Sequence, residues 1–394
     1  MALDEPSAQL HLELRASVQA ALNTGRPLLH HLNADTSWLL QLPRPATARK
    51  KGGRYYYNIL IDPWLSGGQS DVASWFSQQF HATESAVKNI AEVEELARET
   101  EILAKGVRLG EGRVNNEEDA SGLSDTLIDA VSISHEFTDH CHKETLLEVH
   151  PDVPVFAAKE AADLVRRWQH FRNVVTLESF GDSGHNDWRM ASQSPLPEWT
   201  SICRLLQKDD VLNYHSAVMI AFNNKSNDTS HATDATVKGS GKRSHRAHDS
   251  DSDETAEAVI YTPHGIYSGD LNLVPAADPP IRTLAFLHGL HNVRIGTASG
   301  RTAQQLNTGA HNGLKAQRVL NAKYWISTHD EVKKGGGLVS WFLQRDVISL
   351  PDALQKEREG AGSDGPIGLD DGDVKAFESV NWVELRNGES RVLV

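Results

Sequence analysis

Apolar residues along the chain follow two periods, one typical of helices and one typical of buried strands. Residues 8–23, 84–106 and 158–171 place apolar side chains three and four positions apart, which predicts helices. Short continuous apolar runs, such as residues 129–134 (DAVSIS) and 153–158 (VPVFAA), predict buried strands. Strands that alternate with helices indicate an α/β protein.

Two β-rich segments precede this alternation. Residues 28–42 (LLHHLNADTSWLLQL) and 55–68 (YYYNILIDPWLSGG) are separated by the basic, Gly-containing residues 43–54, which predicts a hairpin with a long loop. Further along, residues 216–222 (SAVMIAF) and 257–265 (EAVIYTPHG) are predicted to be adjacent strands.

The last third of the chain continues the alternation. Apolar residues 281–290 (IRTLAFLHGL) precede a predicted helix over 313–322 and a strand over 323–328 (KYWIST), which ends in His329, Asp330 and Glu331. Beyond about Leu350 the pattern predicts no element.

One internal segment interrupts the pattern. Asn223 to Thr255 is rich in Ser, Asp, Lys and His and has almost no apolar residues, which predicts a disordered insertion within one domain. The predicted organisation is therefore an N-terminal helical extension over 1–27, one domain over 28–350 with the insertion at 223–255, and a C-terminal tail over 351–394.

Composition limits the class of protein. The 394 residues are 39% hydrophobic, enough for a sizeable core, and the longest apolar runs are too short to span a bilayer. The first residues carry acids where a signal peptide would be basic, so we expect a cytoplasmic protein, with the nucleus as the alternative. A net charge of −14 argues against nucleic acid as a partner. Nothing in the sequence indicates the oligomeric state.

A histidine-rich loop is the main chemical feature. In SISHEFTDHCHKETL a predicted strand ends in a loop with His135, Asp139 and His140 and opens into a helix, an arrangement that can aim imidazoles and a carboxylate at one divalent metal. The chain has 19 histidines and two cysteines, so any metal site must use mainly His and carboxylates. The alternative is a structural one, in which Asp139 caps the helix and both histidines are polar residues at element ends.

The order of elements from about Leu28 to Leu350 resembles the metallo-β-lactamase fold superfamily. LNADTSWLLQL and NILIDPWLSGG resemble its opening hairpin and strand, and DAVSISHEFTDH is similar to its His-x-His-x-Asp-His motif. VIYTPHG and WISTHDE resemble its later metal-binding strands. The resemblance implies a four-layered αββα sandwich. It looks closest to the branch that includes ascorbate-6-phosphate lactonase and N-acyl-phosphatidylethanolamine phospholipase D.

The resemblance also implies a set of metal ligands. Asp139, His140 and His329 match the ligands of the second metal position, and His264 stands where an aspartate usually bridges two metals. Asp62 matches the aspartate that braces the metal loop.

The first metal position is incomplete. His135 is present, but Phe137 replaces the second histidine, and His215 is the only candidate for the third ligand; it is equally readable as a polar residue at a strand edge. A neutral His264 in place of a bridging carboxylate favours one metal per chain, Zn²⁺ first, with Fe²⁺ or Mn²⁺ as alternatives. We therefore expect Phe137 to form an apolar wall beside the metal loop.

Two further groups of polar residues are candidates for supporting roles. The first flanks the ligands and could orient them or donate protons, and the second lies in Gly-rich segments that could line a pocket mouth. Ordinary solvated or turn positions explain both groups equally well. The two groups are Glu136, His142, Asp330 and Glu331, and His288, His291 and His311.

The function these features predict is hydrolysis of an ester, lactone or phosphodiester of a small molecule by metal-activated water, with Asp139 and His264 as catalytic residues. The alternative, suggested by Phe137, is a catalytically inactive protein of the same fold that binds a metabolite or a protein partner. A nuclease is disfavoured by the acidic charge and by the lack of a recognisable added nuclease domain.

Overall fold

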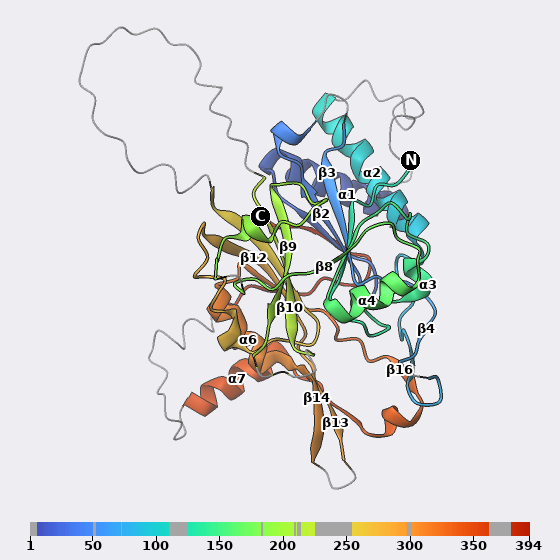
Figure 1. Ribbon diagram of the computed structural model, residues 1–394, viewed down its shortest axis with the longest axis vertical. Coiled ribbons are helices and arrows are strands. Elements are labelled where there is room, and N and C mark those ends of the chain that lie inside the picture. The colour runs from blue at the N-terminus through green and yellow to red at the C-terminus, as the bar shows by residue number, and fades with distance from the viewer. Residues whose placement is uncertain are drawn as a thin grey trace, which may run out of the picture.

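The computed structural model describes residues 6–49, 53–71, 73–109, 125–182, 184–208, 210, 214–224, 254–297, 301–361 and 380–394. Two β-sheets form its centre (Figure 1). The first has seven strands in the order β19 (Ser390–Val392), β1 (Leu28–His31), β2 (Trp38–Pro43), β3 (Tyr56–Ile61), β6 (Ala130–Ile133), β7 (Val155–Ala157) and β8 (Val174–Thr176). The second has six, in the order β18 (Trp382–Val383), β15 (Tyr324–Ile326), β12 (Ile281–His288), β11 (Ala256–Thr262), β10 (Ser216–Phe222) and β9 (Thr200–Leu206).

Side-chain alternation explains how the two sheets pack. Successive residues of a strand point to opposite faces. In β10, Val218, Ile220 and Phe222 join the apolar core that both sheets share, whereas Ala217 and Met219 join the cluster on the outer face. Both faces of the strand are therefore covered, which is why its sequence is a continuous apolar run.

Helices cover the two outer faces. The helices α2 (Ile90–Leu109) and α4 (Lys159–Arg167) pack on the seven-stranded sheet, and α6 (Gly309–Leu320) and α7 (Leu350–Ala361) pack on the six-stranded sheet. This is a four-layered αββα sandwich, so the predicted fold class is confirmed.

Both ends of the chain pack on the sandwich. Helix α1 (Pro6–Thr24) buries Val18, Ala21 and Leu22 beside α2 and β1, close to the helix predicted over 8–23. The last described segment supplies β18 and β19, an edge strand for each sheet, so the predicted boundary at 350 leaves out part of both sheets. The predicted insertion lies, except for its ends, outside the described residues.

The pattern of apolar and polar residues did not predict two small sheets. One has the order β14 (Thr302–Thr308), β13 (Asn292–Gly296) and β17 (Leu343–Asp346), and the other β16 (Lys334–Gly336), β5 (Gln78–Phe80) and β4 (Gly68–Gln69). Short, partly exposed strands lack the apolar alternation that marks a strand in a sequence. The helix predicted after residue 141 is only α3 (Lys143–Leu146).

Single 3₁₀ turns complete the described elements: η1 (Ala46–Ala48), η3 (Trp188–Ala191), η4 (Ser268–Leu271) and η5 (Leu338–Trp341). Among the helices described, none is both long enough and apolar enough to cross a membrane.

The buried ring of His30 on β1 provides a test of this packing. Its Nδ1 lies 2.5 Å from Ser390 Oγ and its Nε2 lies 2.7 Å from Gln41 Oε1. Burial lowers the pKa of His30 from 6.5 to about 4, against the opposing hydrogen bond to Gln41. The folded chain therefore binds this proton more weakly than the unfolded chain does.

We predict that the unfolding free energy falls as the pH falls from about 6.5 to about 4, because in this range His30 binds a proton in the unfolded chain but not in the folded chain. His30 accounts for up to roughly 3 kcal/mol of this loss. Urea denaturation across this pH range should give a shallower dependence for His30→Gln than for the wild type, with the exposed His150→Gln as the control. Equal slopes for all three proteins would contradict the prediction.

Candidate metal centre

The candidate site lies along one rim of the sandwich, where strands end. Strands β1, β3 and β6 run in the same direction in one sheet, and β11 and β15 do so in the other. The carboxyl ends of parallel strands meet at one edge of a sheet. The residues placed there directly after these strands are Asp35, Asp62, His135, Asp139, His140, His264 and His329.

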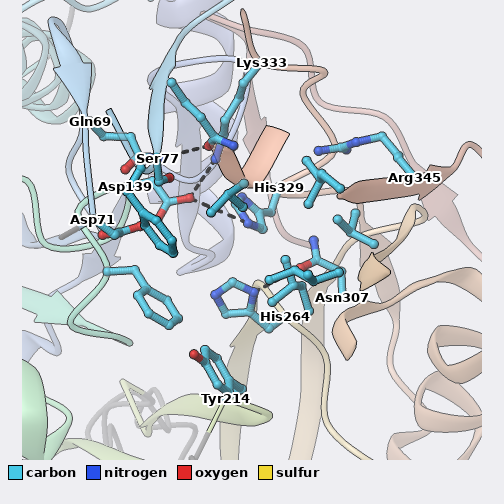
Figure 2. Close-up of a pocket in the computed structure, with 18 residues that line it drawn as sticks. Gln69, Asp71, Ser77, Asp139, Tyr214, His264, Asn307, His329, Lys333 and Arg345 are labelled. Carbon is cyan, nitrogen blue, oxygen red and sulfur yellow. Dashed lines mark hydrogen bonds and ion pairs between the residues drawn. The ribbon is translucent and has the colours of Figure 1, made fainter. Parts of the chain in front are cut away.

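Three histidines from different strands converge at this rim. One ring nitrogen from each of His140, His264 and His329 lies within 4.8 Å of the other two. Asp139 is beside them, with Oδ1 3.6 Å from His140 Nε2 and Oδ2 3.9 Å from His329 Nε2. The structure therefore brings together the four residues that the sequence predicted as the main ligands, and Figure 2 shows three of them, Asp139, His264 and His329.

Each of the three imidazoles is oriented by an oxygen acceptor on its Nδ1. His140 Nδ1 lies 2.8 Å from Asp62 Oδ2, His264 Nδ1 lies 3.0 Å from Asn307 Oδ1, and His329 Nδ1 lies 3.2 Å from both carboxylate oxygens of Asp35. These acceptors place the ring proton on Nδ1, which leaves the Nε2 lone pair for the site.

The Nε2 atoms of His140 and His264 are buried and have no hydrogen-bond partner in the described part of the chain. A buried polar atom without a partner is unfavourable unless something else satisfies it. Three imidazoles held by acceptors on Nδ1, with Nε2 directed to a common point, form a donor set that fits a divalent metal ion.

Asp62 braces the loop after β6, as the resemblance implied. Its Oδ1 accepts a hydrogen bond of 2.7 Å from the backbone N–H of Ser134, and its Oδ2 accepts from the Ser134 hydroxyl and from His140. Asp62 has a φ of 42° and His329 has a φ of 58°, in the left-handed region that non-glycine residues rarely adopt. Backbone strain of this kind is often found at functional sites.

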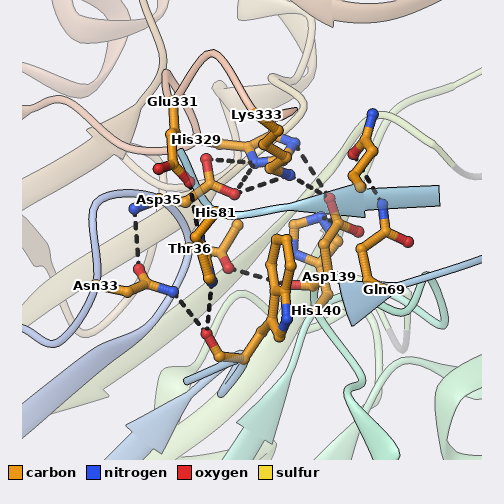
Figure 3. A network of polar contacts seen from close by, with 12 residues as sticks. Asn33, Asp35, Thr36, Gln69, His81, Asp139, His140, His329, Glu331 and Lys333 are labelled. Atoms are coloured by element: carbon orange, nitrogen blue, oxygen red, sulfur yellow. Dashed lines mark hydrogen bonds and ion pairs between the residues drawn. The ribbon is translucent and has the colours of Figure 1, made fainter. Parts of the chain in front are cut away.

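Lys333 was not predicted as a site residue, but its charge organises the centre (Figure 3). Its side chain is 5% exposed, and its Nζ lies 2.7 Å from Asp139 Oδ2 and 2.8 Å from Asp35 Oδ2. Asp35, Asp139 and His329 form a second group whose ligand atoms lie within 4.8 Å of one another. The Lys333 ammonium therefore provides a positive charge beside the two carboxylates of this second group.

The charges of this group are fixed at neutral pH. Although burial favours a neutral carboxyl, Lys333 and the neighbouring histidines hold the pKa of Asp139 well below its usual range, and Lys333 and His329 do the same for Asp35. Burial favours a neutral amine, but the two carboxylates raise the pKa of Lys333. One ammonium faces two carboxylates, so the group has a net charge of −1 that a cation beside it would balance.

The histidines differ in their affinity for a proton. Burial and the neighbouring His140 and His329 hold the pKa of His264 well below its usual value, and burial and Lys333 lower that of His329. Burial also lowers the pKa of His140, but the opposite effect of Asp139 and Asp62 is larger, so that the net shift is upward. A metal ion would therefore displace a proton mainly from His140.

The incomplete first metal position is filled by aromatic stacking. The His135 ring lies 4.1 Å from the Phe137 ring, and the Tyr214 ring stacks on Phe137 at 5.1 Å. His135 Nδ1 lies 2.8 Å from Glu136 Oε2, and in the described chain His135 belongs to neither group of convergent ligand atoms. Phe137 lines the pocket as the apolar wall that the sequence predicted.

His215 does not complete the first position by itself. Asp210 holds it, with Oδ2 2.6 Å from the His215 backbone nitrogen and 3.2 Å from Nδ1. Its Nε2 is buried without a hydrogen-bond partner among the described residues. The convergent groups among those residues do not include His215.

The residues that flank the ligands mainly brace loops. The Glu331 carboxylate accepts hydrogen bonds from the backbone N–H groups of residues 82 and 83 and lies 2.7 Å from His81 Nδ1. Asp330 accepts from the backbone N–H groups of Leu290 and His291. His142 caps α3 by accepting from the backbone N–H of Thr145.

The three histidines that the sequence offered as candidates for the pocket mouth are not among the residues that line the pocket. His288 is buried at the end of β12, and His311 lies in α6 with its Nδ1 3.0 Å from Glu357. His291 contacts a residue that does line it, because its Nδ1 accepts a hydrogen bond of 3.0 Å from Arg345.

A cavity of about 250 Å³ opens beside the three histidines. Its polar side includes Asp71, Asp139 and Lys333, and its opposite side is lined mainly by apolar side chains from β13, β14, β17 and η5. Burial and the nearby Asp139 raise the pKa of Asp71, whose Oδ1 accepts from the backbone N–H of Thr138. The pocket thus combines a candidate metal centre with an apolar wall.

Sequence reasoning missed Asp35, Lys333, Asp71 and Arg345. The segment LNADTSW, which contains Asp35, was recognised only as part of the opening hairpin. Lys333 follows His329 by four positions in HDEVKK, but nothing distinguishes it from the exposed Lys334 next to it. Partners that are distant in sequence decide these roles.

The chain is a four-layered αββα sandwich with a rim of histidines and aspartates, which is the arrangement expected from the resemblance of its motifs to the metallo-β-lactamase superfamily. No family model matches the sequence, and no curated protein matches it.

Three solved structures are similar in fold. A "possible metal-dependent hydrolase" from Veillonella parvula has a TM-score of 0.45 and 11% identity, covering 93% of this chain and 100% of its own. An isothiocyanate hydrolase from Delia radicum gut bacteria has a TM-score of 0.42 and 12% identity, covering 93% and 98%. The metallo-β-lactamase fold protein YhfI from Bacillus subtilis has a TM-score of 0.39 and 10% identity, covering 93% and 99%. At these TM-scores the likenesses say nothing about substrate or metal.

We predict that Lys333→Met lowers the unfolding free energy of the metal-free protein by roughly 3–5 kcal/mol, because it leaves the buried carboxylates of Asp35 and Asp139 without their cation. Lys334→Met, which changes the exposed neighbour, should stay within about 0.5 kcal/mol of the wild type. Urea denaturation in the presence of a chelator measures both. Equal stability of the two variants would show that the carboxylates do not need Lys333.

Proposed function

We propose that this protein is a metal-dependent hydrolase with one divalent metal ion held by His140, His264 and His329. The observation that carries the proposal is the shared orientation of the three imidazoles, each fixed through Nδ1, with two of the Nε2 atoms buried and unpartnered. Three neutral imidazoles and an open position are typical of catalytic zinc sites. Zn²⁺ is therefore the proposed ion, with Fe²⁺ or Mn²⁺ as alternatives.

A metal ion bound there would supply Lewis acidity, both activating water and polarising the scissile carbonyl or phosphoryl group. Asp139, ionised and fixed by Lys333, would accept a hydrogen bond from the attacking water and orient it. We assign His264 to metal binding first, because its Nε2 has no other partner in the described structure. His135 would stay outside the coordination sphere.

The leaving group needs a proton donor, and Asp71 is the candidate. Its carboxyl lines the pocket, and burial and Asp139 raise its pKa. Its Oδ1 accepts hydrogen bonds from the backbone N–H and the hydroxyl of Thr138, which leaves Oδ2 for the leaving group.

The proposed substrate is a small molecule with an ester, lactone or phosphodiester bond. The pocket volume of about 250 Å³ supports a small ligand, and the net charge of −14 argues against a nucleic acid. The proposed compartment is the cytoplasm, and the lactonase-like branch remains the proposed relationship. Turnover of lactones, thioesters and phosphodiesters by the metal-loaded protein is the direct test.

A second candidate is a catalytically inactive protein that uses the pocket to bind a metabolite or protein partner. Lys333 favours it, because an ammonium already satisfies Asp35 and Asp139, and these carboxylates need no metal ion. Metal content separates the candidates, since a purified chain that retains no metal after reconstitution supports the second.

We predict that His140→Ala, His264→Ala and His329→Ala each weaken metal binding at least a hundredfold and remove hydrolysis with it, because a three-histidine site rarely tolerates loss of one donor. Asn307→Ala removes only the acceptor of His264 and should weaken binding about 10- to 100-fold. Elemental analysis and competition with a chelator measure these changes.

The exposed His150→Ala serves as the control for these variants and should bind metal as the wild type does. Circular dichroism confirms that each variant is folded. Undiminished metal binding by folded His264→Ala would remove this histidine from the proposed site.

We predict that Phe137→His leaves the first ion bound and adds a donor beside His135, since the two rings are stacked 4.1 Å apart. The metal content should rise above one ion per chain at high metal concentration, while the wild type stays at one. Phe137→Leu, which keeps the wall apolar, is the matched control. Two ions per chain in the wild type would show that another residue supplies the missing ligand.

A further inference from the structure

One cation in the pocket lacks an acidic partner. Arg345 on β17 lines the cavity and is half-buried, and its one hydrogen bond within the described chain is the one it donates to His291 Nδ1. No carboxylate of the described residues lies within ion-pair distance of its guanidinium. Burial lowers the pKa of Arg345, and Asp35, Asp330 and Glu331 raise it only from beyond that distance. Arg345 points toward the part of the pocket where Lys333 and His329 lie (Figure 2).

The register of the small sheet places Arg345 inside an apolar surface. Residues directly opposite each other in neighbouring strands share a face of the sheet. Arg345 pairs with Val293, and Leu343 pairs with Ile295, so all four side chains face the pocket. Asn307, which holds His264, pairs with Val293 from the other side and lines the same pocket. The apolar wall, the guanidinium and the candidate metal centre therefore share one cavity.

On the opposite face of this sheet, an arginine forms an ion pair with an acid. Arg294 points away from the pocket, and its Nη1 lies 2.6 Å from Asp346 Oδ2 while its Nε donates to Gln344. Asp346 follows Arg345 directly in the chain, but alternation puts its carboxylate on the other face. The sheet thus pairs its outer arginine with an acid and leaves its inner arginine without one.

Lys333 cannot take the role of an anion receptor. Its ammonium already lies between Asp35 and Asp139, and that group has a net negative charge, which repels an anion. Arg345 is held by a neutral acceptor, because burial lowers the pKa of His291. A guanidinium presents a planar set of N–H donors that matches a carboxylate or phosphate group.

We propose that the pocket takes an amphipathic anion, whose carboxylate or phosphate group pairs with Arg345 and whose apolar part lies along Val293, Ile295, Leu306 and Leu343. This inference rests on the proposed function, since it names the class of molecule that would be presented to the three histidines. His291 acts as a positioning residue, because it holds the guanidinium without neutralising it. Phe76 and Val339 also line this cavity, and Phe76 is 36% exposed, so the apolar part would extend toward the surface there.

Binding of simple probes tests the proposal without turnover. Calorimetry would compare hexanoate, hexyl phosphate and the neutral hexanamide, first on chelator-treated protein and then on zinc-loaded protein. In both forms we expect the wild type to bind at least one of the two anions about tenfold or more tightly than the amide. The better anion then distinguishes a carboxylate from a phosphate group. Affinity should also rise about threefold per methylene from butanoate to octanoate.

Arg345→Gln should abolish the preference for anions while leaving hexanamide binding and metal content unchanged. Arg294→Gln, on the opposite face of the same sheet, is the matched control and should keep the wild-type preference. Equal affinity for anion and amide in the wild type would overturn the proposal, and so would an anion preference that survives in Arg345→Gln.

The two hypotheses fail in different ways. Anion binding that requires zinc and ignores Arg345→Gln would place the anion on the metal, which refutes the role of Arg345 and supports the metal centre. Anion binding that depends on Arg345 in a chain that takes up no metal would support the receptor and refute the metal-dependent hydrolase.

Discussion

The site depends on one buried cation between two carboxylates. Asp35 follows β1 and Asp139 follows β6, both in the seven-stranded sheet, whereas Lys333 follows β15 in the six-stranded sheet. The ion pairs therefore connect loops of the two sheets at the rim where the histidines meet. Removing Lys333 would leave two buried carboxylates without a cation, and removing the carboxylates would leave a buried ammonium without an anion. Both changes are strongly unfavourable. The geometry of the histidines relies on this link, because Asp35 also orients His329.

The same interaction changes the chemistry that the fold can support. An ammonium beside Asp35 and Asp139 supplies one positive charge without an open coordination position, so it can anchor carboxylates but cannot activate water. The histidines next to it differ, because the Nε2 atoms of His140 and His264 are buried and have no hydrogen-bond partner among the described residues. Phe137 and its stack with His135 and Tyr214 close the remaining position with apolar surface. The candidate metal centre thus lies between a fixed charge and an aromatic wall.

The small sheet of β14, β13 and β17 gives this centre its surroundings. One face supplies the apolar wall and Arg345, while Asn307 from the same sheet fixes His264. In the proposed function, ligand selection and the orientation of His264 would therefore both rest on this small sheet, which lies outside the main sandwich. A sheet of short strands is less constrained by the core than the central strands are, and function is commonly carried by such peripheral segments.

The apolar pattern of the sequence by itself indicated an α/β protein with buried strands, because continuous apolar runs specify such strands. The αββα sandwich and the grouping of Asp139, His140, His264 and His329 followed from the resemblance of its motifs to the metallo-β-lactamase superfamily. The same resemblance identified Asp62 as the aspartate that braces the metal loop. Only the tertiary structure revealed Lys333, Asp35, Asp71 and Arg345. Lys333 and Lys334 are identical in type and adjacent, yet one is buried between two carboxylates and the other is exposed. Arg345 and Arg294 differ only in the face of a sheet that the pattern did not predict. A charge acquires its role from partners that are far away in sequence, and local periodicity contains no information about those partners.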